Sequence, residues 1–171
     1  MNDDVFPLQQ GALDWLCSIY AAINAMNVCG EIATLDDAAD PFRNAIKFMQ
    51  KEKGWNLSKA IRKGIDEQDC RELFQKLSGA AWGVDSETDY PDRLVRLKDL
   101  LDRGAKAVVV SLVRVASEPR DVLHYTVVTG VSSKRLTFFN SQRKKIEQNG
   151  GNLRYDGADV SLGYFYVKKA K

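Results

Sequence analysis

The sequence changes character at the run Ala107-Val108-Val109-Val110-Ser111-Leu112-Val113. A short run of mostly β-branched apolar residues is typical of a buried strand. Before it, apolar residues recur at spacings of three and four, which predicts helices. After it, further short runs bounded by turn residues predict strands. Helices followed by antiparallel strands indicate an α+β fold.

The first 105 residues carry the signals of several helices. Asp14, Thr34 or Asp36, and Asp66 are suited to cap three of them, because a short polar side chain accepts bonds from first-turn N–H groups. Pro41 is expected near the start of the second helix. Glycines then follow the apolar stripes and are suited to end them. The expected helices cover residues 15–29, 35–53, 57–63, 67–78 and 92–103.

The β half is expected to contain a hairpin and a closing strand. Residues 124–130 and 135–140 flank a short polar turn, and residues 162–167 form a last apolar run. Between them, residues 141–159 are polar and rich in Gly and Asn, which predicts a long loop. No repeat or linker interrupts the chain. We therefore expect one domain over residues 1–171, with a helical half to about 105 and a β half from about 106.

Composition excludes several classes of protein. Of the 171 residues, 44% are apolar and 28% charged, which is typical of a folded domain. The three cysteines are an odd number with no C-x-x-C pair, and there is a single histidine. These counts argue against a disulfide framework and against structural zinc, and we expect no cofactor. No apolar run is long enough to span a membrane, so we expect a soluble cytoplasmic protein, with export by a specialised route left open.

The carboxyl-terminal part is basic. Residues 131–171 contain 9 Lys and Arg against 3 Asp and Glu, whereas the whole chain carries a net charge of +2. Lysines of this kind commonly keep a sheet edge solvated and unpaired. The second interpretation is a surface that docks an acidic protein partner. Nucleic acid is disfavoured, because interleaved glycines and stacking aromatics are missing from the basic positions.

Four residue types occur in an order that suits thiol catalysis. Cys17 falls in the first turn of the first helix, where the helix dipole favours a thiolate. His124 begins one strand of the expected hairpin and Asn140 ends the other, so they are neighbours if the hairpin has no register shift. Gln10, or alternatively Gln9, is suited to donate a hydrogen bond to an oxyanion beside Cys17.

This order resembles the papain-like cysteine peptidases, nearest the small bacterial enzymes that cleave bacteriocin leader peptides after a double glycine. The likeness is carried by Gln10-Gly11-Ala12-Leu13-Asp14-Trp15-Leu16-Cys17-Ser18-Ile19-Tyr20-Ala21-Ala22-Ile23-Asn24, by His124-Tyr125-Thr126-Val127-Val128 and by Phe138-Phe139-Asn140-Ser141. The resemblance implies a papain-like fold with the active site in a cleft between a helical half and a β-sheet half. It also implies a peptide or protein substrate.

Three positions depart from the family's usual pattern. Gln10 lies one residue further from Cys17 than the family's glutamine, Ser18 replaces a common glycine, and the leader-cleaving enzymes tend to carry Asp where this chain has Asn140. The resemblance thus implies a cysteine peptidase or isopeptidase that forms a thioester on Cys17. Two alternatives stay open: a deamidase or amidase with the same apparatus, and a binding module without catalysis that uses its basic part.

Overall fold

The structure is a computed structural model that describes residues 7–8, 16–56, 58, 61, 65–78, 93–112, 124–132, 135–139, 152–154 and 160–166. Four helices fall within these ranges: α1 (Cys17–Val28), α2 (Leu35–Lys51), α4 (Glu67–Ser78) and α5 (Arg93–Asp102). The described strands are β1 (Ala107–Leu112), β2 (His124–Val131), β3 (Arg135–Phe139), β4 (Asn152–Arg154) and β5 (Val160–Tyr166). Helices precede strands along the chain, so the α+β prediction is confirmed.

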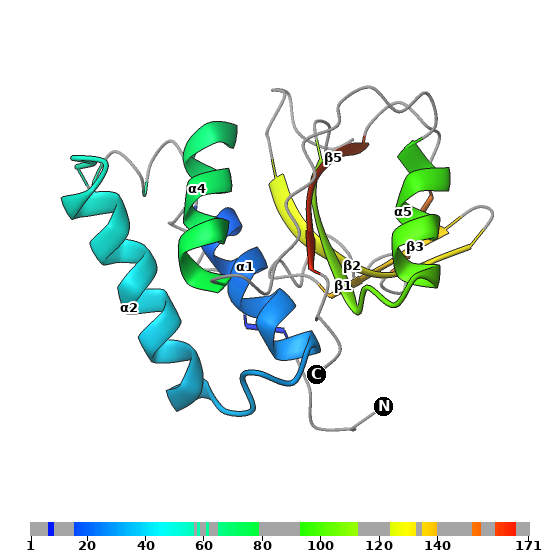
Figure 1. Cartoon of the computed structure of the whole chain (residues 1–171), viewed down its shortest axis with the longest axis horizontal. Coiled ribbons are helices and arrows are strands. Elements are labelled where there is room, and N and C mark those ends of the chain that lie inside the picture. The colour runs from blue at the N-terminus through cyan, green and yellow to red at the C-terminus, as the bar shows by residue number, and fades with distance from the viewer. Residues whose placement is uncertain are drawn as a thin grey trace.

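The five strands form one antiparallel sheet in the order β4-β3-β2-β1-β5. Figure 1 shows α5 on one side of this sheet and α1, α2 and α4 on the other. Helix α1 packs against β1 and β2 and also contacts α2 and α4. It is therefore the central element that joins the helical layer to the sheet. No helix within the described ranges is both long and apolar enough to cross a bilayer.

Alternate residues of the central strands feed two separate cores, because successive strand residues point to opposite faces. The core on one face, which we call the α1-side core, includes α1 and α4 residues together with Ala107, Val109, Tyr125 and Val127. The core on the other face, the α5-side core, joins α5 to Val108, Val110, Val128 and Leu136. The first four residues of the apolar run, Ala107 to Val110, are thus buried, two against each face.

Local signals account for most of the helix ends. Helix α1 begins at Cys17 with Leu16 in the cap position, while the predicted cap Asp14 lies outside the described residues. Thr34 caps α2 as expected, through a reciprocal capping box with Asp37. Asp66 caps α4, since its side chain accepts the Asp69 N–H at 2.9 Å. Pro41 was expected near the start of α2 but lies well inside it.

Two features of the β half differ from expectation. The loop predicted over residues 141–159 contains the short strand β4, whose Asn152 pairs with Thr137 at the edge of the sheet. This strand is short and two of its three residues are polar, so hydrophobic periodicity gives no signal for it. The closing strand β5 pairs with β1 and carries a register irregularity opposite Val109 and Val110.

Candidate active site

Cys17 is the first residue of α1, and it is the most exposed of the three free cysteines. Its exposed fraction is 7%, against 2% for Cys29 and 0% for Cys70. The positive end of the helix dipole lies at this position and favours an anion there. No acidic residue occurs in the first turn to offset that field. The prediction that a cysteine occupies the amino end of the first helix is therefore confirmed.

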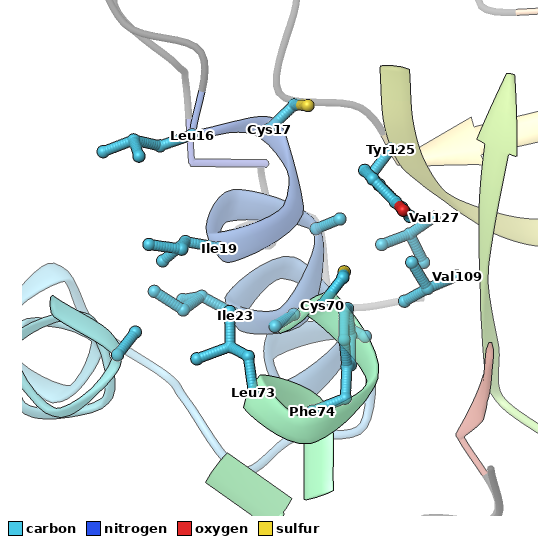
Figure 2. Packing of buried hydrophobic residues seen from close by; sticks show 14 of the residues in the cluster. Leu16, Cys17, Ile19, Ile23, Cys70, Leu73, Phe74, Val109, Tyr125 and Val127 are labelled. Carbon is cyan, nitrogen blue, oxygen red and sulfur yellow. The ribbon is translucent and has the colours of Figure 1, made fainter. Parts of the chain in front are cut away.

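His124 is the first residue of β2, and its Cα pairs with that of Leu112 at the end of the described ladder. The next residue, Tyr125, is buried in the α1-side core, which also contains Cys17. Figure 2 shows Cys17 and Tyr125 at the same end of the α1–β2 interface, with Val127 and Val109 further along. The start of α1 and the start of β2 therefore lie at the same end of the interface between α1 and the sheet.

The strand alternation gives position 124 a different face from Tyr125. Tyr125 and Val127 belong to the α1-side core, and Val128 belongs to the α5-side core. Position 124 has the register parity of Val128, because it is four residues away. By register alone, position 124 thus shares the parity of the strand residues in the α5-side core. As the terminal residue of the strand, however, it lies where the constraint of the ladder ends.

Asn140, the predicted partner of His124, lies outside the described residues. The strand that leads to it ends at Phe139, which pairs with Val127. The end of described β3 is therefore three ladder positions from His124. The hairpin also carries a register irregularity between Val128 and Gly130, so the condition on which that neighbourhood was predicted, a hairpin without a register shift, is not met.

Gln9 and Gln10 also lie outside the described residues, but the residue before them is held firmly. The Leu8 N–H donates to Asn24 Oδ1 at 2.8 Å, and Asn24 Nδ2 donates to the Leu8 carbonyl at 3.2 Å. Asn24 is fully buried in α1. Sequence reasoning missed this residue. The signal that could have found it is a lone amide within the apolar run Ile23-Asn24-Ala25, since a buried polar group needs a hydrogen-bond partner.

Ser18, where the resembling family commonly has glycine, is buried beside Cys17. Its exposed fraction is 1%, and its Oγ has no hydrogen-bond partner in the part of the chain that the structure describes. Within those residues no cluster of His, Cys, Asp and Glu is arranged to hold a metal ion. The described part of the site thus consists of a thiol, a buried hydroxyl and an amide on one helix.

A search against protein-family models and a search of curated proteins both found no match to this chain.

Proposed function

We propose that the protein is a cysteine hydrolase of papain-like type in which Cys17 is the nucleophile, His124 the base, Asn140 its orienting partner and Gln10 an oxyanion donor. The observation that supports this most is that Cys17 opens the central helix at the end of the interface where β2 begins with His124. A thiol at a helix amino terminus with an imidazole in reach is the arrangement that activates a nucleophilic cysteine.

In the proposed reaction, His124 takes the proton of the Cys17 thiol and the thiolate attacks an amide carbonyl. The tetrahedral oxyanion is stabilised by the Cys17 backbone N–H and by the Gln10 side chain. Its collapse breaks the C–N bond, the leaving amine takes the proton from His124, and a thioester remains on Cys17. Water, deprotonated by His124, then hydrolyses the thioester to a carboxylate and regenerates the thiol.

The leaving group distinguishes the related activities. A peptide or isopeptide substrate releases an amine, whereas a deamidase or amidase with the same apparatus releases ammonia. We take a peptide or protein as the substrate class and the cytoplasm as the place of action, because three free cysteines suit a reducing compartment. No cofactor enters this chemistry.

The proposal makes one structural demand. The His124 imidazole has to reach across the end of the sheet toward α1, although position 124 shares the register parity of the α5-side core. His124 belongs to the last described pair of the ladder, with Leu112, so a neighbouring pair holds its backbone in the pleat on one side only.

The test is the pH profile of alkylation by iodoacetamide. In folded wild type we expect Cys17 to react at pH 6 nearly as fast as at pH 8, because an activated thiol is already a thiolate. In urea all three cysteines give the reference behaviour of ordinary thiols, whose reaction slows about tenfold per pH unit below a pKa of ~8.5. In His124→Ala we expect Cys17 to follow that reference. A wild-type profile that matches the urea reference, or one unchanged by His124→Ala, contradicts the proposal.

The strand alternation at His124 and the buried Ser18 favour one second function, a binding module without catalysis. Its basic part, residues 131–171, would dock an acidic partner. This function predicts that the protein binds poly-glutamate, that binding weakens steeply between 50 and 300 mM salt (rough working values for screening), and that Cys17→Ala binds equally well. Absence of binding at low salt counts against it.

A further inference from the structure

A hollow of about 390 Å³ lies between α1 and α2 in the helical layer. The two helices contact each other (Figure 1). The short side chains of Ala38 and Ala39 border the hollow and leave the space unfilled. Most of its wall is formed by Leu8, Tyr20, Ile23, Ala38, Ala39 and Phe42. Cys17 does not line it, so binding there is independent of the proposed catalysis.

The wall of the hollow is held by contacts among the described residues. The Leu8 N–H donates to Asn24 Oδ1 at 2.8 Å, and Asn24 Nδ2 donates to the Leu8 carbonyl at 3.2 Å. Asn24 is fully buried, so water competes little for these bonds. The Tyr20 ring on α1 meets the Phe42 ring on α2 edge to face, with the ring centroids 5.6 Å apart. The hollow is therefore preformed.

Arg43 is the one charged side chain among the described residues that line the hollow. Its Nε donates to the Ala39 carbonyl at 3.3 Å and its Nη2 to Asp40 Oδ1 at 2.5 Å, so the guanidinium is held along α2. Its Nη1 donates to no described residue and can bind an anion. Leu35, which is 71% exposed, extends the apolar lining to the solvent. An apolar hollow with one cation beside it is complementary to an amphiphilic anion.

We propose that this hollow binds a small aromatic molecule with a single carboxylate or sulfonate, which pairs with Arg43. Small-molecule sites have volumes from about 300 Å³ upward and a mainly apolar lining with few polar groups. An apolar cavity of about 150 Å³ holds one benzene ring. A hollow of about 390 Å³ therefore holds two or three rings. The alternative is a packing defect, which predicts no saturable ligand.

The test uses two fluorescent probes that differ in one group. Anilinonaphthalene sulfonate carries the anion, and phenylnaphthylamine is the same ring system without it. We expect native wild type to bind the sulfonate probe at one site, with a dissociation constant on the order of 10–100 μM. Arg43→Gln should weaken the sulfonate probe about three- to fivefold, the upper range for an exposed ion pair, and leave the neutral probe within about 1.5-fold.

Lys47→Gln is the matched control for charge. It removes the same charge from α2 one turn further on, at a position that does not line the hollow. At about 0.15 M ionic strength it should change the binding of either probe by less than about 1.5-fold, because a charge outside the site is screened.

A pair of substitutions at Ala39 locates the bound probe. Ala39→Trp occupies part of the hollow and should weaken both probes about tenfold, whereas Ala39→Ser adds little volume and should leave both within about twofold. A measurement on wild type needs no variant. The methyl signals of Ala38 and Ala39 should shift most among the alanine methyl groups when the sulfonate probe is added.

Four results would overturn the proposal. The first is that the sulfonate probe does not bind saturably to the native protein, and the second is that Arg43→Gln weakens both probes equally. The third is binding that depends on Lys47 and not on Ala39, which would place the probe in a second hollow, of about 340 Å³, lined by α2 and α4. The fourth is a probe signal without a cooperative urea transition, since loosely packed states also bind this dye. Neither probe reacts with Cys17, so these results are separate from any failure of the proposed hydrolase.

Discussion

The two faces of the sheet are supported by cores of different size and different chemistry. Among the described residues, the α1-side core contains 21 buried residues and includes all three cysteines, whereas the α5-side core contains 7, all of them Ala, Val or Leu. The buried polar residues Ser18 and Asn24 belong to α1 as well. One face therefore carries the groups capable of chemistry, and the other holds the sheet in shape.

Strand β2 is important for the proposed site because it contributes residues to both faces. Its residues alternate between the face that carries the cysteines and the face whose buried cluster consists of Ala, Val and Leu, and His124 is its first residue. A shift of a single residue in the path of the chain at that point exchanges one environment for the other. The proposed hydrolase requires the His124 imidazole to serve the face that carries Cys17.

The largest stability effect should come from a matched pair of leucines, one in each core. Leu73 and Leu97 are both almost fully buried, at 0% and 1% exposed. We expect Leu73→Ala to lower the free energy of unfolding by about 4 kcal/mol and Leu97→Ala by about 2–3 kcal/mol, because a small core closes more easily around the lost side chain. Urea unfolding followed by circular dichroism measures both. A larger loss of unfolding free energy in Leu97→Ala than in Leu73→Ala would contradict the expectation that the smaller core adjusts more easily.

The same pair tests whether the two cores unfold together. We expect one transition with an unchanged urea slope in each variant, since β1 and β2 supply residues to both cores. Two transitions in Leu97→Ala would mean that α5 and its face form an independent unit.

Much of this arrangement could be predicted from sequence because it depends on local signals. The β-branched run correctly predicted β1, and the short polar residues Thr34 and Asp66 correctly predicted the starts of α2 and α4. Edge strand β4 could not be predicted, since a strand of three residues is too short to show a hydrophobic period. The register irregularity in the β2–β3 hairpin is equally invisible, because one extra residue does not change the composition of a strand.

The candidate site was only partly predictable, because only one of its features depends on a local sequence pattern. The place of Cys17 follows from the local pattern of α1, and the structure agrees with it. The relation of His124 to Cys17 depends instead on tertiary packing between a helix and the end of a strand, which no local pattern encodes. Asn24 was missed because its partner is the backbone of Leu8, sixteen residues away, and a backbone partner has no sequence signature.

A smaller effect is expected within the helical layer at Lys53. Its Nζ lies 3.1 Å from Asp69 Oδ1 and 2.6 Å from Glu72 Oε2, so it ties the end of α2 to α4. We expect Lys53→Met to lower the Tm by about 1–3 °C at pH 7. Lys98→Met is the control on the opposite side of the molecule. Among the described residues it pairs with the exposed Asp102 alone, and its loss should lower the Tm less.

The pH dependence distinguishes this ion pair from simple packing. The hydrogen bond to Glu72 is the main cause that raises the pKa of Lys53 above its ordinary 10.5. A raised pKa means that the stabilisation is complete below about pH 10.5 and is lost as the pH rises through the value in the folded protein. The Tm difference between wild type and Lys53→Met should therefore shrink above that pH. A difference that stays constant to pH 12 (about the upper limit for such scans) would indicate a packing effect.

An effect of similar size is expected at the exposed start of α2, in the helical layer. Hydrogen bonds from the Thr34 side chain, and then from the Ala33 and Thr34 N–H groups, hold the pKa of Asp37 below its ordinary 3.8. That stabilisation is present above pH 3.8 and is lost as the pH falls through the lower value in the folded protein. We expect Asp37→Ala to lower the Tm by about 2 °C at pH 7, and the gap to close as the carboxyl is protonated. Asp36→Ala is the control, because it removes a charge from the same first turn and leaves the capping bonds of Asp37 in place. An equal loss of Tm in Asp36→Ala would mean that Asp37 stabilises the helix through its charge and not through its hydrogen bonds.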